Sequence, residues 1–236
     1  MIPKIVHMSW KTKDVVNSQS PIILNGLKQI IEINPDWDIQ ISTDDEVNLY
    51  LKDNLPKDYY KLVENIGIVP QTDIWRLIKL FKVGGVYVDI DRLCNKPLND
   101  LVEEGVKWVL PTCEDNDFSH DFMMTAANNP AFANVIKLYF ERRAAGYDNV
   151  FFLGAQTYMH GITHTLVGEM VNTNPGKEKF DWLRDKIKHA GFISTYRESL
   201  PNNTVIYKGN ISDSEWESMK RSFYADSNVK HWTNEW

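Results

Sequence analysis

The chain has 236 residues, of which 43% are hydrophobic and 25% are charged, and its formal net charge is −6. This composition is typical of a globular protein with an ample core, and a negative charge without Lys/Arg clusters excludes a nucleic-acid-binding surface. The only cysteines, Cys94 and Cys113, exclude a disulfide framework, and no apolar run reaches the roughly 20 residues of a membrane-spanning helix.

We therefore expect one domain over residues 1–236, without a transmembrane segment and in a reducing, cytoplasmic location. The N-terminal part alternates apolar strands with amphipathic helices. The expected elements are a strand at Ile2–Ser9, a helix at Pro21–Ile33, a strand at Trp37–Ser42 and a helix opened by a capping box at Thr43–Glu46. This order predicts a mostly parallel sheet covered by helices, with ligands at the carboxyl ends of its strands.

His7 and Trp10 lie in and directly after the first expected strand. An aromatic face at the end of a strand is a good platform for a nucleotide base, and a buried core tryptophan is the alternative for Trp10. A hydrogen-bonded core histidine is the favoured interpretation of His7.

The stretch from Gln71 to Asp91 carries the strongest functional signal. Its first half predicts a helix, since Ile74, Leu77, Ile78 and Phe81 recur at helical spacing. Asp73 and Arg76 are three residues apart on a flank of this apolar stripe, so their side chains can meet each other or one ligand. Gly84-Gly85 then ends the helix.

The second half, Val86–Asp91, predicts a buried strand in which Tyr87, Asp89 and Asp91 share one face. Two carboxylates at the end of an apolar strand are costly unless a partner compensates them. Mg²⁺ or Mn²⁺ suits such oxygens and is often completed by substrate phosphates. The alternatives are a solvated turn for the two aspartates and a surface ion pair for Asp73 and Arg76.

The composite Thr72-Asp73-x-x-Arg76, Gly84-Gly85-x-Tyr87-x-Asp89-x-Asp91 resembles the DXD-containing glycosyltransferases. The resemblance is to the Och1-like mannosyltransferase and capsular polysaccharide group, and to the glucosyltransferase domains of large clostridial toxins. It implies a GT-A-type α/β fold with a mixed, mainly parallel sheet flanked by helices. It also implies retention of the anomeric configuration.

The resemblance assigns a role to each residue of the motif. Asp91 is expected to bind the metal directly, and Asp89 to bind the ribose and the metal. Asp73 and Arg76 are expected to hold the sugar hydroxyls, which completes a predicted catalytic set of Asp73, Arg76, Asp89 and Asp91. Tyr87 is expected to pack near the nucleotide, and Trp10 matches the H-x-x-W tryptophan that stacks on the base in the toxin relatives.

Further landmarks follow the motif. The sequence predicts strands at Lys107–Pro111 and Phe122–Ala127, a helix at Ala131–Ala145 and a turn around Gly154, where similar proteins approach the transferred sugar. The C-terminal His231-Trp232-Thr233-Asn234-Glu235-Trp236 resembles the closing H-W-x-G-S-W of the family. By that resemblance, His231 is a third metal ligand and Trp236 covers the donor; a frayed tail is the alternative.

Together these features predict a metal-dependent transferase. It would move a hexose from a nucleoside diphosphate sugar, a UDP- or GDP-hexose, to a hydroxyl of a glycan or other acceptor, with Mn²⁺ or Mg²⁺. Two alternatives stay open. One is a metal-dependent phosphohydrolase, and the other is a catalytically inactive module that binds nucleotide sugars.

Overall fold

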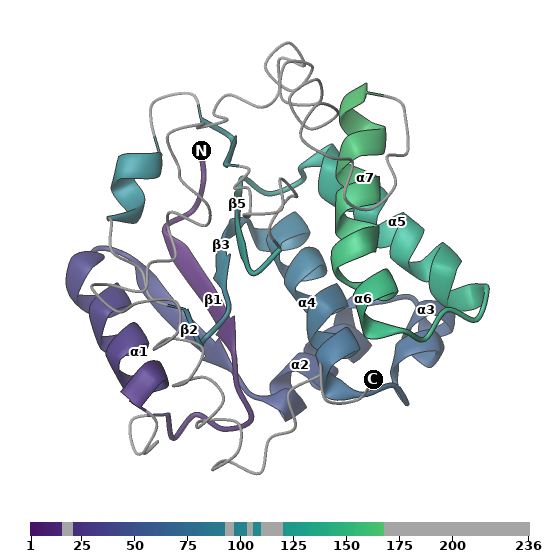
Figure 1. Cartoon of the computed structure of the whole chain (residues 1–236), viewed down its shortest axis with the longest axis horizontal. Coiled ribbons are helices and arrows are strands. Elements are labelled where there is room, and N and C mark those ends of the chain that lie inside the picture. Colours follow the sequence, from purple (N-terminus) through teal and green to yellow (C-terminus); the bar gives the residue numbers. More distant parts are fainter. Residues whose placement is uncertain (16–20, 93–96, 103–105, 110–119, 168–236) are drawn as a thin grey trace, which may run out of the picture.

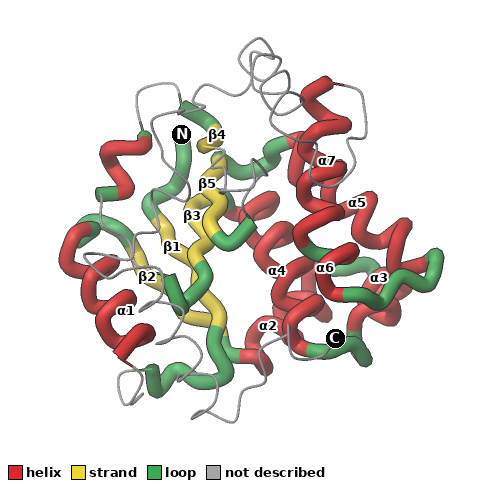
Figure 2. The backbone as a smooth tube through the Cα atoms, in the orientation of Figure 1, coloured by secondary structure: helices red, strands yellow, loops and turns green. Residues whose placement is uncertain are grey.

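The protein folds around one five-stranded sheet. The computed structural model describes residues 1–15, 21–92, 97–102, 106–109 and 120–167 (Figures 1 and 2). The strands are β1 (Ile5–Ser9), β2 (Asp38–Ser42), β3 (Gly85–Val88), β4 (Trp108–Val109) and β5 (Phe122–Thr125), in the spatial order β2-β1-β3-β5-β4. β1 pairs in parallel with β2 and β3, and β5 is antiparallel to both β3 and β4, so β5 alone among these strands runs in the opposite direction. The predicted mixed, mainly parallel sheet is confirmed.

Helices cover both faces of the sheet (Figure 1). They are α1 (Pro21–Ile33), α2 (Asp44–Asn54), α3 (Lys57–Val63), α4 (Ile68–Val83), α5 (Pro130–Ala144), α6 (Val150–Leu153) and α7 (Ala155–Val167), with a 3₁₀ helix at Leu98–Leu101. Helix α1 and the 3₁₀ helix pack on one face, and α2 to α7 build the core on the other. In the described ranges, no helix combines the length and the apolar character that crossing a bilayer requires.

The alternation of side chains along β3 divides the two cores. Val86 and Val88 face the α1 side, whereas Tyr87 faces the α4 side. The neighbouring β5 follows the same rule, with Phe122 on the α1 side and Met123 on the α4 side. A two-residue side-chain period therefore delivers Tyr87 to the face against which helix α4 packs.

Several predicted elements are confirmed, with shifted ends. Helix α1 has the predicted bounds, and the capping box before α2 forms: the Glu46 N–H donates to the Thr43 hydroxyl at 3.2 Å and the Thr43 N–H to the Glu46 carboxylate at 2.9 Å. Helix α4 begins earlier than predicted, at Ile68, and β3 ends at Val88, before the two aspartates. Helix α3 was not predicted, and two helices, α6 and α7, flank the predicted turn at Gly154.

The Gly84-Gly85 pair is required by close backbone contacts. Both residues have positive φ, 76° and 102°. A Cβ on Gly84 would lie 2.7 Å from the Ala127 backbone nitrogen, and one on Gly85 would lie 2.5 Å from the Ile5 carbonyl oxygen. Only glycine allows β3 to leave α4 and pair at once with β1.

His7 fastens β1 to this turn and predicts a pH dependence of stability. Its Nε2 is 3.0 Å from the Gly84 carbonyl oxygen, and the side chain is buried. Burial lowers the pKa of His7 to about 4, from 6.5. The folded protein thus holds His7 neutral while the unfolded chain protonates it, so stability is complete above pH 6.5 and is lost as the pH falls towards 4.

We expect the free energy of unfolding to fall by about 2 kcal/mol more between pH 7 and pH 5 in the wild type than in His7→Gln, because glutamine does not titrate. Urea unfolding at the two pH values measures this difference. The contributions of other histidines are common to both proteins and cancel. Equal pH dependences would contradict a neutral, buried His7.

Candidate functional site

Charged side chains meet where β1 and β3 end. In the register of this pair, His7 is opposite Tyr87, which brings Trp10 and Asp89 to the same edge of the sheet. From β1 the chain crosses to β2 on one side and then returns to β3 on the other. The carboxyl ends of two such diverging parallel strands are where open α/β sheets bind ligands. The site predicted from the sequence therefore has the expected place in the fold.

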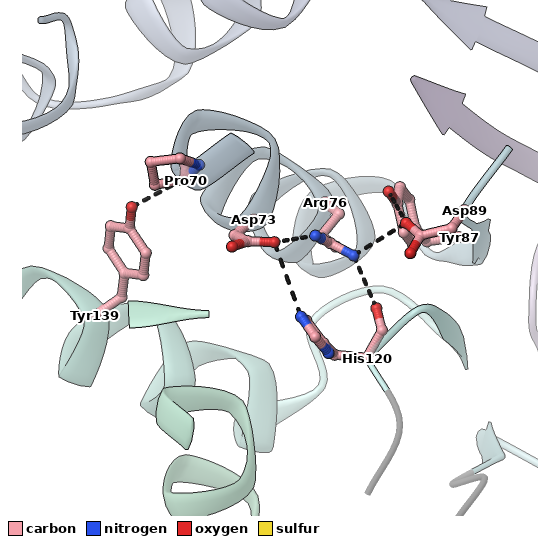
Figure 3. Close-up of polar contacts among 7 residues, drawn as sticks. All are labelled: Pro70, Asp73, Arg76, Tyr87, Asp89, His120 and Tyr139. Carbon is pink, nitrogen blue, oxygen red and sulfur yellow. Dashed lines mark hydrogen bonds and ion pairs between the residues drawn. The ribbon is translucent and has the colours of Figure 1, made fainter. Parts of the chain in front are cut away.

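Helix α4 presents Asp73 and Arg76 to this edge as a buried pair (Figure 3). An Arg76 Nη2 hydrogen bond to the Asp73 carboxylate joins them, and their side chains are only 7% and 4% exposed. Arg76 Nη1 donates to Asp89 Oδ1 at 3.2 Å and to the His120 carbonyl oxygen at 3.1 Å. The surface ion pair considered as an alternative is wrong, because Arg76 is buried. It connects helix α4 with Asp89, which follows β3, and with His120, which precedes β5.

Tyr87 holds the Asp89 carboxylate by a hydrogen bond. Its hydroxyl donates to Asp89 Oδ1 at 2.6 Å, and the Arg76 guanidinium lies 4.7 Å from the centre of its ring. Burial raises the pKa of Tyr87 well above 10, so the phenol remains a donor at neutral pH. Tyr87 is 2% exposed, and its predicted place near the nucleotide remains a prediction.

The carboxyl group of Asp89 has a raised pKa. Burial raises its pKa, the Arg76 charge opposes that rise, and the carboxylates of Asp91 and Asp121 add to it. Asp91 is itself 7% exposed, and Asp121 pairs with Arg92. Among the described residues, Arg76 pairs with the carboxylates of Asp73 and Asp89, and Arg92 pairs with that of Asp121, while Asp91 lies close enough to raise the pKa of Asp89.

This group of carboxylates fits a divalent cation. Its charge would offset the repulsion among Asp89, Asp91 and Asp121, and carboxylate oxygens are the ligands that Mg²⁺ and Mn²⁺ prefer. Within the described residues, no group of three or more His, Cys, Asp or Glu side chains is arranged to hold a metal ion by itself. A cation bound here would be held by one or two carboxylates and completed by phosphate oxygens and water.

The remaining predicted site residues divide into two groups. Trp10 lies at the predicted edge and is partly buried. Its backbone N–H donates to the Ser42 carbonyl oxygen at 2.9 Å, and Lys11 Nζ lies 5.7 Å from the centre of its ring. His231 and Trp236 lie outside the described residues. Their assignments as metal ligand and donor cover remain predictions.

The sequence interpretation missed two members of the cluster, His120 and Asp121. They precede β5, whose antiparallel register with β3 places Val88 opposite Phe122. The Asp89 N–H donates to the Asp121 carbonyl oxygen at 2.9 Å, which extends this ladder beyond the strand. A polar pair directly before an apolar strand was the available signal, but only the strand pairing shows that it meets Asp89.

Gly154 closes the other side of Asp73. A Cβ on Gly154 would lie 2.5 Å from Asp73 Oδ2 and 3.1 Å from the Val150 carbonyl oxygen. The turn between α6 and α7 therefore packs its bare backbone on the carboxylate. The resemblance had placed this turn near the transferred sugar, and the structure places it against the residue that was predicted to hold that sugar.

We expect Gly154→Ala to displace the Asp73 carboxylate and to lower stability by about 1–3 kcal/mol, the usual cost of an extra methyl group in a packed site. Urea unfolding and glycosyl transfer measure the two effects. Gly67→Ala is the control, because a Cβ there meets only Pro70 Cδ at 3.9 Å. If both variants behave alike, the contact with Asp73 has no functional weight.

The known proteins that this chain resembles include several named as glycosyltransferases. Residues 23–107 match the family described as "Glycosyltransferase sugar-binding region containing DXD motif". Inositol phosphoceramide mannosyltransferase 2 of Schizosaccharomyces pombe is 30% identical over 208 residues, covering 88% of this chain and 50% of that protein. A mannosyl phosphorylinositol ceramide synthase of Saccharomyces cerevisiae is 28% identical over 139 residues, covering 58% of this chain and 35% of that protein. The chain spans half or less of the length of these relatives.

A solved structure titled PaToxG glycosyltransferase superimposes with a TM-score of 0.52 at 18% identity, over 98% of this chain and 87% of that one. The predicted GT-A-type fold is confirmed by this likeness.

The predicted cytoplasmic location is wrong. The relatives are named for the mannosylation of inositol phosphoceramide, and ceramides are membrane lipids. The names of these relatives therefore contradict a cytoplasmic location.

Proposed function

We propose that this chain, which carries the DXD-containing sugar-binding region of a glycosyltransferase family, transfers a hexose from a nucleoside diphosphate sugar to an acceptor hydroxyl and depends on a divalent cation. The observation that carries this proposal is the convergence of the Asp89, Asp91 and Asp121 carboxylates, whose mutual repulsion raises the pKa of Asp89. A divalent cation would relieve that repulsion, and the oxygens of a diphosphate would complete its ligands.

Each residue has a distinct task in this proposal. Asp91 binds the cation, and Asp89 binds the cation and the ribose. Arg76 fixes the carboxylates of Asp73 and Asp89 in one orientation, and Asp73 accepts hydrogen bonds from the hydroxyls of the hexose. Trp10, beside them at the end of β1, stacks on the base.

The leaving nucleoside diphosphate gains negative charge as the bond between the anomeric carbon of the hexose and the diphosphate oxygen breaks. Bound Mn²⁺ or Mg²⁺ supplies Lewis-acid stabilisation of that charge. The protein's own contribution is a rigid set of carboxylates at strand ends, so that little reorganisation is needed during the reaction. By the family resemblance, the product keeps the anomeric configuration of the donor.

The names of the relatives suggest the first substrates to test, mannose as the sugar and inositol phosphoceramide as the acceptor. The direct experiment incubates the protein with GDP-mannose or UDP-glucose, with and without Mn²⁺, and separates free sugar, glycosylated acceptor and sugar 1-phosphate. Metal-dependent release or transfer of the sugar supports the proposal. Release of sugar 1-phosphate and nucleoside monophosphate alone would identify a phosphohydrolase, and metal-dependent binding without turnover would identify an inactive module.

A further inference from the structure

The predicted sugar clamp, Asp73 and Arg76, is the less exposed part of the cluster around Arg76. The Asp73 and Arg76 side chains are 4% and 7% exposed, whereas those of Asp89 and His120 are 33% and 28% exposed. Asp89 is already engaged by Arg76 and Tyr87. Of these four described residues, His120 is the one whose accessible side chain has no hydrogen bond within the group.

The position of His120 is fixed through its main chain. Its carbonyl oxygen accepts the Arg76 Nη1 hydrogen bond at 3.1 Å, and the antiparallel register of β5 with β3 places it opposite Ile90, between the two aspartates of the motif. The ring lies 6.2 Å from the Tyr158 ring of α7, measured between centroids. Figure 3 shows the imidazole beside the carboxylate of Asp73, on the same side of Arg76.

The ring itself has unused hydrogen-bonding capacity. His120 Nε2 lies 3.9 Å from Asp73 Oδ1, beyond hydrogen-bond distance, and neither ring nitrogen has a hydrogen-bond partner among the described residues. The nearby carboxylate favours the tautomer with the proton on Nε2. Nδ1 is then a free acceptor, and the Nε2–H and Asp73 together can receive a group placed between them.

The electrostatic surroundings keep this ring uncharged. Burial lowers the pKa of His120 well below 6.5, and the charges of Arg76 and Arg92 lower it further. A neutral imidazole next to a carboxylate has one donor and one acceptor nitrogen, which matches the donor and acceptor character of a sugar hydroxyl. It does not match a phosphate, which requires donors and positive charge.

We propose that His120 is a sugar-binding residue of this site, which hydrogen-bonds a hydroxyl of the transferred hexose jointly with Asp73 and distinguishes the nucleotide sugar from the bare nucleotide. This inference rests on the proposed function and deepens it. It extends the contact with the sugar from Asp73 to His120, at the edge of the cluster that a ligand can reach. No covalent step is assigned to His120.

The test compares the gain in affinity from nucleotide to nucleotide sugar. Isothermal titration with Mn²⁺ gives Kd for GDP and GDP-mannose, and for UDP and UDP-glucose, in the wild type and in three variants. His120→Phe keeps a ring against Tyr158 but has no nitrogen. His120→Gln restores an amide that can accept and donate. His164→Ala is the matched control, an exposed histidine on α7.

We expect His120→Phe to bind GDP and UDP as the wild type does. Its affinity for the nucleotide sugars should fall about tenfold, which corresponds to one hydrogen bond of about 1–1.5 kcal/mol. His120→Gln should recover part of that loss, and His164→Ala should lose nothing. An unchanged sugar increment in a folded His120→Phe protein would overturn the inference, and so would an equal loss for nucleotide and nucleotide sugar. If the wild type binds neither nucleotide, the proposed function fails, and this inference fails with it.

Discussion

Asp91→Asn is expected to abolish transfer and to weaken metal-dependent nucleotide binding on the order of 100-fold or more, while the fold remains. Asparagine has nearly the same shape but no charge, so the cluster would no longer balance a divalent cation. Changes in groups that merely support a metal ligand typically cost about 10–100-fold in affinity, and the loss of a direct ligand should exceed that. Asp91 is 7% exposed, so the neutral amide is also easily accommodated.

Isothermal titration of Mn²⁺ with GDP or UDP measures this effect, and thermal unfolding checks the fold. Asp58→Asn is the matched control, because the Asp58 side chain on α3 is 93% exposed and far in sequence from the motif. Removal of the charge at Asp91 also relieves the repulsion that raises the pKa of Asp89. The pKa of Asp89 should therefore be lower in the variant than in the wild type. Wild-type affinity in Asp91→Asn would refute the assignment of Asp91 as a metal ligand.

The sequence predicted what local patterns determine. The helical spacing of Ile74, Leu77 and Ile78 identified α4, and the two glycines marked the one place where α4 passes directly into β3. The capping box at Thr43 identified the start of α2. Each of these signals depends on residues within a few positions of one another. Such elements can therefore be predicted from the amino-acid sequence alone.

The sequence did not predict what depends on distant pairing. His120 and Asp121 enter the site because β5 runs antiparallel to β3, which is a property of two strands more than 30 residues apart. The burial of Asp73 and Arg76 depends on the turn at Gly154 and on β5, neither of which the periodicity of α4 can reveal. A position on a helix flank therefore left a surface ion pair open as an alternative, and the fold creates a buried pair. The predicted location failed for another reason: the lack of an apolar segment does not identify a compartment.

Arg76→Ala is expected to lower the free energy of unfolding by about 3–5 kcal/mol and to abolish transfer. Arg76 holds two carboxylates and one carbonyl, and its removal leaves Asp73, with a 4% exposed side chain, as a buried charge without its partner. Breaking one half of a buried ion pair typically costs this amount. The hydrogen-bonded Asp89 would also lose the charge that opposes the rise of its pKa.

Because Arg76→Ala changes stability and activity together, Arg76→Lys separates the two. Lysine keeps the positive charge but is a single point donor, which cannot bind Asp73, Asp89 and the His120 carbonyl oxygen in one fork. Arg76→Lys should thus fold with a smaller loss of stability and still lose transfer. Urea unfolding, steady-state transfer kinetics and GDP or UDP affinity measure the three consequences for each variant.

Arg143→Ala is the control for removal of a guanidinium. Within the part of the chain that the structure describes, the Arg143 guanidinium on α5 donates only to the backbone carbonyls of Leu62 and Tyr147, each at 3.0 Å. Its loss should therefore cost about 1–2 kcal/mol of stability and no transfer activity. If Arg76→Ala resembles Arg143→Ala in both measurements, Arg76 is one more structural arginine and the site has no guanidinium centre. If Arg76→Lys transfers the hexose at the wild-type rate, the charge of Arg76 alone is sufficient, and the fork geometry that joins helix α4 to the two strand ends has no part in the reaction.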